Sequence, residues 1–497
     1  MKRIFCLAAI IGAALASFSC SGGEETTFSN PVIQGDLADP TVIRVGEKYY
    51  ATGSSYDWSP EFPLYVSDDL VNWKQIGNIL EEKPEWTSTG FWAPELFEHN
   101  GRFYCFYSAG RASDGKHCIG MAVADKPEGP YIDKGYILDS GTEQIDSHIF
   151  NDNGTLYMTW KAHGVDPCPD EIACAKLRDD CLGLAGEEFT LIRDDERLGD
   201  EGQCMFKRDG WYFLLYSARA CCGPASDYEV RLARAKSVEG PWEKCPDNPI
   251  LSGGTADVKA LGHGTVVETP DGRLFYLCHA YFTERNFFLG RRPFLSELES
   301  TEDGWIRCVT GPKAKVVQKT PFRGTIQTVA DSFHADFTQG ALDPSWSYPV
   351  AKGEMSVLCQ RPFCTDYTVS AVVKENADRE CGLIFFGSHS DYAAVSVTVD
   401  PDSGERNIVV KTAFEGDGET VKTWPAPAAS PLILSAVVTG ALEVTFKWSA
   451  GDEEWSCPLP VGLERLMRWD SAFRPGIYSC GGNAEDSFQS FSIKEID

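Results

Sequence analysis

The chain has 497 residues, too many for one typical domain, and 43% of them are apolar and 12% aromatic, enough for more than one buried core. Its formal net charge of −28 at pH 7 argues against binding nucleic-acid phosphates or an anionic membrane surface. The acidity alone does not identify a partner, because a negative surface is also an ordinary route to solubility.

The first twenty residues, MKRIFCLAAIIGAALASFSC, form a targeting segment. Lys2 and Arg3 precede a short apolar run, and small residues precede Cys20. Segment 1–20 is similar to a bacterial lipoprotein signal, which implies export and a lipid on Cys20 that anchors the protein to the cell envelope. An ordinary secretory signal is the alternative, and the side of the membrane, periplasmic or outer, stays open. No later segment is apolar enough to cross a bilayer, so we expect membrane contact only through that lipid.

Sixteen of the 18 cysteines remain when Cys6 and Cys20 are set aside. Their spacing contains no CxxC pair and no zinc pattern. The densest group is Cys168, Cys174 and Cys181, and Cys221 and Cys222 are adjacent. In an exported protein we interpret them as structural thiols or a few disulfides rather than as a metal site, with no pairing that the sequence fixes.

Five similar strings recur along the first 280 residues: GEKYYATGS (46–54), NGRFYCFYS (100–108), NGTLYMTWK (153–161), DGWYFLLYS (209–217) and DGRLFYLCH (271–279). Each is a turn glycine followed by a short aromatic strand, and the glycines recur every 53 to 62 residues. Alternating strands such as 64–73, 119–131 and 230–242 lie between them. A recurrence of this length built from strands predicts an all-β fold with a five-bladed β-propeller, which we place at 27–325.

The pattern changes after residue 330. Segments such as DYTVSAVVKE, CGLIFFGSHSDYAAVSVTVD and LILSAVVTGALEVTFKW alternate apolar and polar residues between turns. They predict an antiparallel β-sandwich of jelly-roll or lectin-like type at 330–497. Such an accessory domain either binds glycans or buttresses the propeller.

Three acidic residues stand just ahead of repeated strands. Asp39 lies in GDLADPTVIRV, Asp146 in EQIDSHIFNDNG and Glu201 in GDEGQCMFKRDG. Each heads a short strand, and because the first strand of a blade lines the propeller axis, the three carboxylates should converge there. Any one of them alone is more simply a turn former or a calcium ligand, but the shared register favours a common site.

Converging carboxylates suit hydrolysis of a glycosidic bond. A protonated acid donates to the leaving oxygen, and an ionised carboxylate accepts a proton from the attacking water. Crowded like charges raise one pKa, and we expect this to keep the glutamic acid protonated, with the third carboxylate supplying the repulsion.

The chain resembles the family 43 glycoside hydrolases over about residues 30–310. The resemblance is carried by ADPTVIRVGEKYY, FWAPELFEHNGRFYCFYS, IDSHIFNDNGTLYMTW, DEGQCMFKRDGWYFLLYS, GHGTVVETPDGRLFYLCHAY and GRRPFLSELESTEDGW. It implies a five-bladed enzyme that inverts the anomeric carbon and requires no cofactor. Asp39 then matches the general base, Glu201 the general acid, and Asp146 the residue that tunes and orients the acid. Inversion leaves room for a water, so the base and acid should stand roughly 6.5–9.5 Å apart.

The same resemblance points to three further positions. Trp92 matches a funnel aromatic that stacks on sugar, although a core tryptophan is an equal alternative. His263 matches a histidine deep in the funnel that is often near a bound calcium, although a structural histidine is the commoner case. Arg291 matches an arginine that contacts the terminal sugar, with Arg292 as a possible substitute one residue away.

The family pattern is not matched everywhere. Gln203 stands where the family usually has proline, Asp200 precedes Glu201, and Asp36 lies close to Asp39, although Asp39 carries the expected Pro40. None of these departures removes a catalytic carboxylate.

The C-terminal sandwich resembles accessory domains that narrow the funnel mouth in exo-acting members. We therefore expect an exo-acting hydrolase that releases a terminal pentose, α-L-arabinofuranose or β-D-xylose, from plant-type polysaccharide or oligosaccharide. The alternatives are a galactan-directed enzyme of the same fold, a retaining enzyme of the fructan-cleaving kind, and a non-catalytic glycan-binding lipoprotein. The oligomeric state is open.

Overall fold

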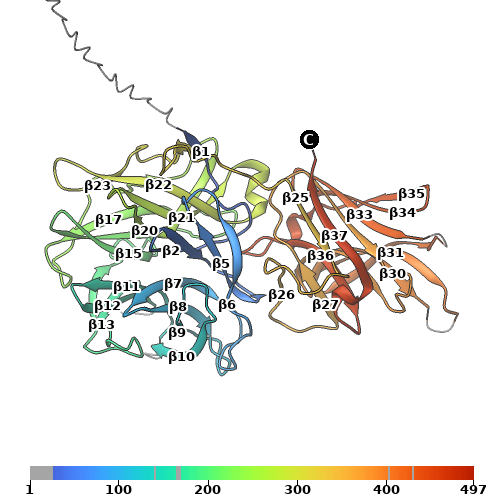
Figure 1. The fold of residues 1–497 in the computed structure, drawn as a ribbon, viewed down its shortest axis with the longest axis horizontal. Helices are drawn as coiled ribbons and strands as arrows, with labels where there is room; N and C mark the ends of the chain where they lie inside the picture. Colours follow the sequence, from blue (N-terminus) through green and yellow to red (C-terminus); the bar gives the residue numbers. More distant parts are fainter. Residues whose placement is uncertain (1–25, 139–141, 164–169, 401–402, 428–429, 497) are drawn as a thin grey trace, which may run out of the picture.

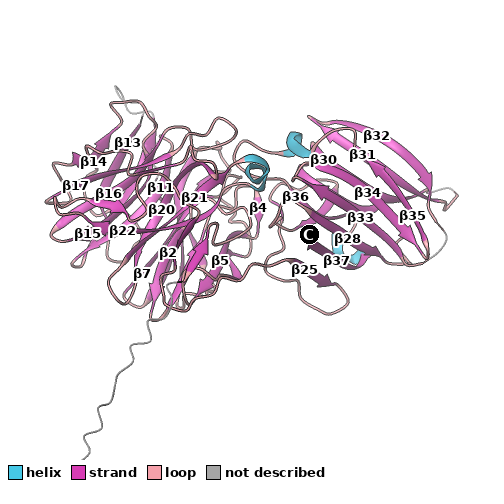
Figure 2. Ribbon diagram, turned by 90° about the horizontal axis from the view of Figure 1, so that it is seen from above, coloured by secondary structure: helices cyan, strands magenta, loops and turns pink. Residues whose placement is uncertain are grey.

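The computed structural model describes residues 26–138, 142–163, 170–400, 403–427 and 430–496. The predicted signal at 1–20, with Cys20, and Cys168 lie outside the described residues. Two β domains lie side by side, the propeller formed by the first part of the chain and the sandwich by the last (Figures 1 and 2). Within the described ranges, no helix has the length and apolar character that a membrane span requires.

The propeller consists of five antiparallel sheets that follow one another along the chain. Their strands are β2 (Thr41–Val45), β3 (Lys48–Thr52), β5 (Glu61–Ser67) and β6 (Lys74–Leu80) in blade one; β7 (Trp92–His99), β8 (Arg102–Gly110), β9 (His117–Ala124) and β10 (Ile132–Leu138) in blade two; β11 (Gln144–Asp152), β12 (Thr155–His163), β13 (Asp170–Lys176) and β14 (Phe189–Arg193) in blade three; β15 (Glu201–Arg208), β16 (Trp211–Ala218), β17 (Glu229–Ala235), β18 (Glu243–Lys244) and β19 (Leu251–Ser252) in blade four; and β20 (Val258–Glu268), β21 (Leu274–Phe282), β22 (Arg292–Ser300) and β23 (Ile306–Cys308) in blade five. The predicted five-bladed propeller is confirmed.

The first strands of the blades form a closed ring. β7 contacts β2 and β11, β15 contacts β11 and β20, and β20 contacts β2. Outside the ring, β1 (Thr27–Ser29) pairs with β24 (Val317–Lys319), so the two ends of the propeller are joined. Every first strand therefore faces the same axis, as the spacing of the acids predicted.

The repeated strings form the second strand of each blade. At Asn100–Gly101 and Asp209–Gly210 both residues have positive φ, 54° and 74° in the first pair and 51° and 77° in the second. Two such residues make the tight turn whose twist matches a hairpin, which explains the Asn-Gly and Asp-Gly pairs at the start of these strings. After the turn nearly every residue of β8 is buried, because blades cover both faces of this strand.

Neighbouring blades hold each other through aromatic and aliphatic cores. Between blades two and three, for example, Phe106 and Met121 pack in one buried cluster with Met158 and Trp160. The high aromatic content predicted buried cores of this kind, since large side chains fill the wedge between tilted sheets.

The C-terminal domain is the predicted antiparallel sandwich. One six-stranded sheet has the order β25 (Ser332–Asp336), β37 (Phe488–Glu495), β28 (Tyr367–Val373), β33 (Leu432–Thr439), β34 (Glu443–Ala450) and β35 (Glu453–Pro458), and the other β27 (Met355–Cys359), β36 (Arg474–Cys480), β29 (Cys381–Ser388), β30 (Asp391–Val399), β31 (Arg406–Phe414) and β32 (Asp417–Pro425). Their inner faces share one core that includes Phe385, Phe446 and Phe491. The described helices are short 3₁₀ turns: η1 (Glu284–Leu289), η2 (Leu463–Leu466) and η3 (Ala484–Ser487).

The sandwich is fixed to the propeller beside the axis. β26 (Tyr348–Pro349) pairs with β4 (Trp58–Ser59) of the propeller. Arg468 donates to Asp57 at 2.6 Å, and the backbone N–H of Ala472 donates to the buried Asp36 at 3.1 Å. These contacts on both sides of residues 469–471 hold that loop of the sandwich against the propeller.

Candidate active site

A pocket of about 260 Å³ lies where the first strands meet the 469–471 loop. All six residues predicted for the site line it: Asp39, Trp92, Asp146, Glu201, His263 and Arg291. The other residues that line it are Glu143, Ile145, His163, Cys221, Cys222, Trp469 and Asp470. Side chains from all five blades and from the sandwich therefore share one cavity.

A backbone kink recurs within or just before the first strand of each blade. The kinked residues are Asp39, Ala93, Asp146, Gly202 and His263, with φ between 44° and 61°. In blades two to five the kink falls at or beside a shift in strand register. Bulges of this kind re-aim side chains, and a left-handed residue other than glycine costs about 1–3 kcal/mol unless its surroundings hold it in place.

The surroundings that hold the kinks are the last residues of the five repeated strings. Ser54, Ser108 and Ser217 each accept a hydrogen bond from the backbone N–H of the next blade's kinked residue, at 2.7 to 3.0 Å. His279 Nδ1 accepts from the N–H of Asp39 at 3.1 Å, which closes the ring. In blade three the equivalent residue is Lys161, and it binds the Glu201 side chain instead. Each blade thus positions a site residue of its neighbour.

Asp39 is held as an ionised carboxylate. Its Oδ1 lies 3.3 Å from Arg291 Nη1, and its Oδ2 accepts a hydrogen bond from Ser54 Oγ at 2.5 Å. Burial alone would raise the pKa of Asp39, but the Arg291 guanidinium and the neighbouring imidazoles hold that pKa well below its usual range. An ionised carboxylate can accept a proton, as a general base does.

Glu201 pairs with a lysine that the sequence analysis did not select. Lys161 Nζ lies 2.7 Å from Glu201 Oε2, and Tyr228 Oη donates to Oε1 at 2.9 Å. Burial opposes ionisation, but these two partners lower the pKa of Glu201 below its usual value. The expectation that crowding raises the pKa of Glu201 is therefore wrong for this arrangement, because Lys161 outweighs the repulsion.

The raised pKa belongs to Asp146. Burial, together with the charges of Glu201 and Asp39, raises the pKa of Asp146 to about 6. Its Oδ2 accepts the backbone N–H of Gly202, the residue after Glu201, at 3.1 Å. Asp146 therefore touches the backbone that carries Glu201, and of these two carboxyls it is the one that holds a proton more tightly.

Trp92 lines the pocket and, half-buried, also packs against a hydrophobic cluster formed by both domains. Its ring stacks on the imidazole of His117 with centroids 3.8 Å apart, and it meets Trp469 edge to face at 5.8 Å. His117 is in turn bound by Glu143 at 2.8 Å. Trp469 is 58% exposed, so the sandwich places an exposed aromatic ring beside the more buried ring of Trp92.

Arg291, and not Arg292, reaches the pocket. Arg291 Nη2 donates to the carbonyl of Asp470 in the sandwich at 3.1 Å. Arg292 points away, over the ring of Phe282 and toward Asn286. The sandwich therefore helps to fix the arginine that binds Asp39.

The departures from the family pattern leave the pocket intact. Asp36 is buried and binds backbone N–H groups of Arg291 and Ala472, and Asp200 is buried without lining the pocket. Gln203, in the place of the usual proline, donates from Nε2 to the backbone carbonyl of Asp146. Gln203 thus ties the neighbouring blades together.

His263 lies between two of the carboxylates. Its Nδ1 is 3.4 Å from Asp39 Oδ1 and 3.7 Å from Asp146 Oδ2. In the part of the chain that the structure describes, no group of three or more His, Cys, Asp or Glu side chains could hold a metal ion. His263 therefore faces two carboxylates directly, and calcium at this position stays a prediction.

Several site residues were missed by the sequence analysis. Lys161, Tyr228, Trp469 and Asp470 carried no motif, and Cys221 and Cys222 were noted only as neighbours. A signal existed for Lys161, because it is the last, polar residue of a repeated string whose equivalents are three serines and a histidine. No comparable signal marked the sandwich residues, which depend on how the two domains dock.

A five-bladed propeller whose axial pocket gathers three carboxyl groups, two with lowered pKa values and one with a raised pKa, defines a carboxylate-type glycoside hydrolase. The family model for glycosyl hydrolases family 43 matches residues 28–306, and the model of the beta xylosidase C-terminal concanavalin A-like domain matches 336–467. The chain belongs to glycosyl hydrolases family 43.

Named relatives are similar over part of their length. Xylosidase/arabinosidase 43B of Humicola insolens is 30% identical over 57% of this chain and 55% of its own. A non-reducing end alpha-L-arabinofuranosidase of Bacteroides ovatus is 28% identical over 68% of this chain and 64% of its own. The chain spans about half the length of the first of these relatives and nearly two thirds of the second.

Solved structures share the fold across both domains. A Bacteroides ovatus xyloglucan-locus family 43 protein superimposes with a TM-score of 0.80 at 20% identity, covering 95% of this chain and all of that one. A Bacillus licheniformis family 43 protein gives 0.79 at 24% identity over the same share of this chain. At these identities the likeness establishes the two-domain fold.

Proposed function

We propose that the protein is an inverting, exo-acting glycoside hydrolase that releases a terminal α-L-arabinofuranose or β-D-xylose from plant-type polysaccharide or oligosaccharide. The observation that carries the proposal is the single pocket shared by Asp39, Asp146 and Glu201, with the sandwich residues Trp469 and Asp470 in its wall. Its volume of about 260 Å³ is below the roughly 300–1,000 Å³ of pockets for drug-sized ligands. A pocket of this size suits one terminal sugar better than the middle of a chain.

In the proposed mechanism, Asp39 takes a proton from a water that attacks the anomeric carbon. Asp146, which has the raised pKa, supplies a proton to Glu201; Glu201 passes it to the leaving oxygen, and the C–O bond breaks in the same displacement. Arg291 keeps Asp39 ionised, Lys161 and Tyr228 orient Glu201, and the configuration at the anomeric carbon inverts.

Active-site variants test the proposal directly. Asp39→Asn and Glu201→Gln should each lower kcat by about 10²–10⁴-fold, because each loses one proton-transfer partner. The assay compares chromogenic α-L-arabinofuranoside, β-D-xylopyranoside and β-D-galactopyranoside, and NMR identifies the anomer released first. Ordinary turnover in either variant would refute the assignment, and a first product that retains the configuration would indicate a different mechanism.

The same panel separates the remaining alternatives. Hydrolysis of the galactoside alone would favour a galactan-directed enzyme, and binding without turnover would favour a glycan-binding protein. The relatives' names, which include xylosidase and arabinofuranosidase, support the pentose.

We also propose that the protein is exported and attached to the cell envelope through a lipid on Cys20. The support is the signal-like segment 1–20 alone. Mass spectrometry of the mature N-terminal peptide should find a diacylglyceryl cysteine at Cys20, and Cys20→Ala should release the protein from the membrane fraction. A mature N-terminus at any other residue would refute the lipid anchor.

A further inference from the structure

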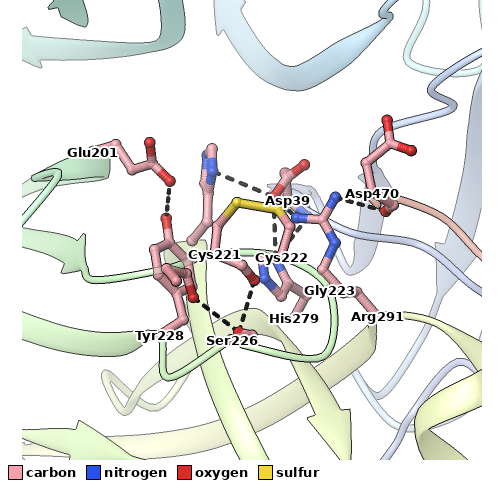
Figure 3. Close-up of a disulfide and its surroundings, with 12 residues drawn as sticks. Asp39, Glu201, Cys221, Cys222, Gly223, Ser226, Tyr228, His279, Arg291 and Asp470 are labelled. Carbon is pink, nitrogen blue, oxygen red and sulfur yellow. Dashed lines mark hydrogen bonds and ion pairs between the residues drawn. A yellow bond between two sulfur atoms is a disulfide. The ribbon is translucent and has the colours of Figure 1, made fainter. Parts of the chain in front are cut away.

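A disulfide lies in the wall of the pocket and has no part in the mechanism above. It joins Cys221 and Cys222, which are neighbours in the chain, and both are partly exposed and line the cavity. Figure 3 shows the sulfur pair between Glu201 on one side and Asp39 with Arg291 on the other. The disulfide therefore borders the space between the proposed acid and the proposed base.

The bond contributes little as a cross-link. The stabilisation that a disulfide gives by restricting the unfolded chain grows with the length of the loop it closes, and here no residue lies between the two cysteines. The surrounding loop is held by other bonds. Ser226 Oγ donates to the Ala220 and Cys221 carbonyls at 2.9 Å, and Gly223 N–H donates to Tyr281 Oη at 3.2 Å. The loop would keep its path without the sulfur–sulfur bond.

What the bond changes is the chemistry of the wall. A thiol is a weak hydrogen-bond donor that rotates about its Cα–Cβ bond, whereas a disulfide has no donor and holds both sulfurs in one place. Sulfur is soft and polarisable and packs well against C–H groups and rings. The other apolar wall residues are Trp92, Ile145 and Trp469, and the remaining residues that line the pocket are charged or polar.

We propose that the Cys221–Cys222 disulfide is a rigid apolar platform on which the C–H face of the terminal sugar rests. This inference rests on the proposed function and adds a binding element to the same site. The charged groups around the pocket, Arg291, Glu143 and Asp470 among them, are left to bind the hydroxyls, while the sulfur pair excludes water from the ring face.

Reduction tests the platform in the intact protein. Dithiothreitol transfers two electrons and two protons to the disulfide, leaving two thiols and its own cyclic disulfide. The reduced enzyme should show a KM about three- to tenfold higher for the pentoside that the oxidised enzyme hydrolyses best, with kcat within about twofold, because an apolar contact made in both ground and transition state is weakened. Reoxidation should restore KM.

Two variants control the experiment. Cys221→Ser/Cys222→Ser should match the reduced enzyme and should not respond to dithiothreitol. Cys364→Ser, which removes a partly buried thiol of the sandwich that does not line the pocket, should keep the oxidised KM. If the double variant fails to fold, the KM of the reduced wild type tests the proposal by itself. The thermal unfolding midpoint of the reduced protein then confirms that it stays folded.

The outcomes separate this inference from the proposed function. Alkylation and mass spectrometry first confirm that the disulfide is reduced. A KM that then stays unchanged would overturn the proposed platform. A fall in kcat with a shifted pH profile would also overturn it, since the bond would then act through Tyr228 on Glu201. If the oxidised enzyme hydrolyses no pentoside, the proposed function fails. Calorimetry then measures the binding of D-xylose and L-arabinose to the oxidised and the reduced protein. Equal affinity in both redox states, or no binding, refutes the platform.

Discussion

Replacing Lys161 with methionine should move the alkaline limb of the pH profile of kcat/KM to higher pH. Lys161 Nζ lies 2.7 Å from Glu201 and 3.9 Å from Asp170, and the lysine stays charged although it is buried. Methionine keeps the apolar stem of the side chain but is one atom shorter, and it removes the ammonium group. Asp146 and Glu201 should then each hold a proton more tightly.

The size of the shift follows from the geometry. An opposite charge at this range lowers a carboxyl pKa by about 1–3 units, so losing it raises the pKa of the pair by a similar amount, or about 1.4–4 kcal/mol. In the wild type the limb should fall near the pKa of Asp146, about 6. In Lys161→Met it should fall at about pH 7–9.

The stability of this variant should change with pH in a defined direction. The folded-state pKa of Glu201 is depressed, so the Lys161 pair stabilises the protein above the unfolded pKa of about 4.3, and this contribution is lost as the pH falls through the folded value. The variant should therefore lose most thermal stability, relative to the wild type, at any pH above about 4.3, and least below it, where Glu201 becomes protonated in the wild type as well.

Initial rates measured across the pH range test whether the lysine charge sets the position of the alkaline limb. Lys161→Arg is the charge-conserving control. The arginine variant should keep the alkaline limb close to that of the wild type. A limb that stays in place in Lys161→Met, or that moves equally in both variants, would show that the lysine charge does not set the proton affinity of the pair.

Two further substitutions test the shape of the site. Gly202→Ala should lower kcat at least tenfold and destabilise the fold by about 1–2 kcal/mol, because its Cβ would lie 2.7 Å from His263 Cγ and its φ is 57°. Gly101→Ala, at φ 74° with no atom within 4 Å, should show a similar loss in thermal melts but normal activity. Trp469→Ala should raise KM about two- to tenfold at unchanged melting temperature, since this exposed ring borders the pocket through Trp92; an unchanged KM would show that the sandwich does not bind substrate.

The blades and the carboxylates could be predicted because their signals are local. A turn glycine and an aromatic strand specify a hairpin within one string, and five copies at similar spacing specify the ring. Asp39, Asp146 and Glu201 then follow from their shared position ahead of those strands. Comparing the last residue of each string in the same way would also have identified Lys161 as a site residue.

Other properties of the site depend on distances that a sequence does not contain. Which carboxyl holds the proton is decided by Lys161 Nζ lying 2.7 Å from Glu201, and not by the presence of three acids. Arg291 meets Asp470, 179 residues away, only because the two domains dock at β4 and β26. The choice between Arg291 and Arg292 likewise required knowing which way each side chain leaves its strand.

The kink that recurs in all five blades has the same backbone geometry each time, but the side chain that it places in the pocket differs from blade to blade. Blades one, three and five present the kinked residue itself to the pocket, as Asp39, Asp146 and His263, whereas blades two and four present the residue before it, Trp92 and Glu201. Five positions around the axis therefore share one backbone geometry, each held by a residue of the preceding blade. The side chains that they present range from carboxyl groups to an imidazole and an indole, so one repeated backbone feature supports different chemistry around a single pocket.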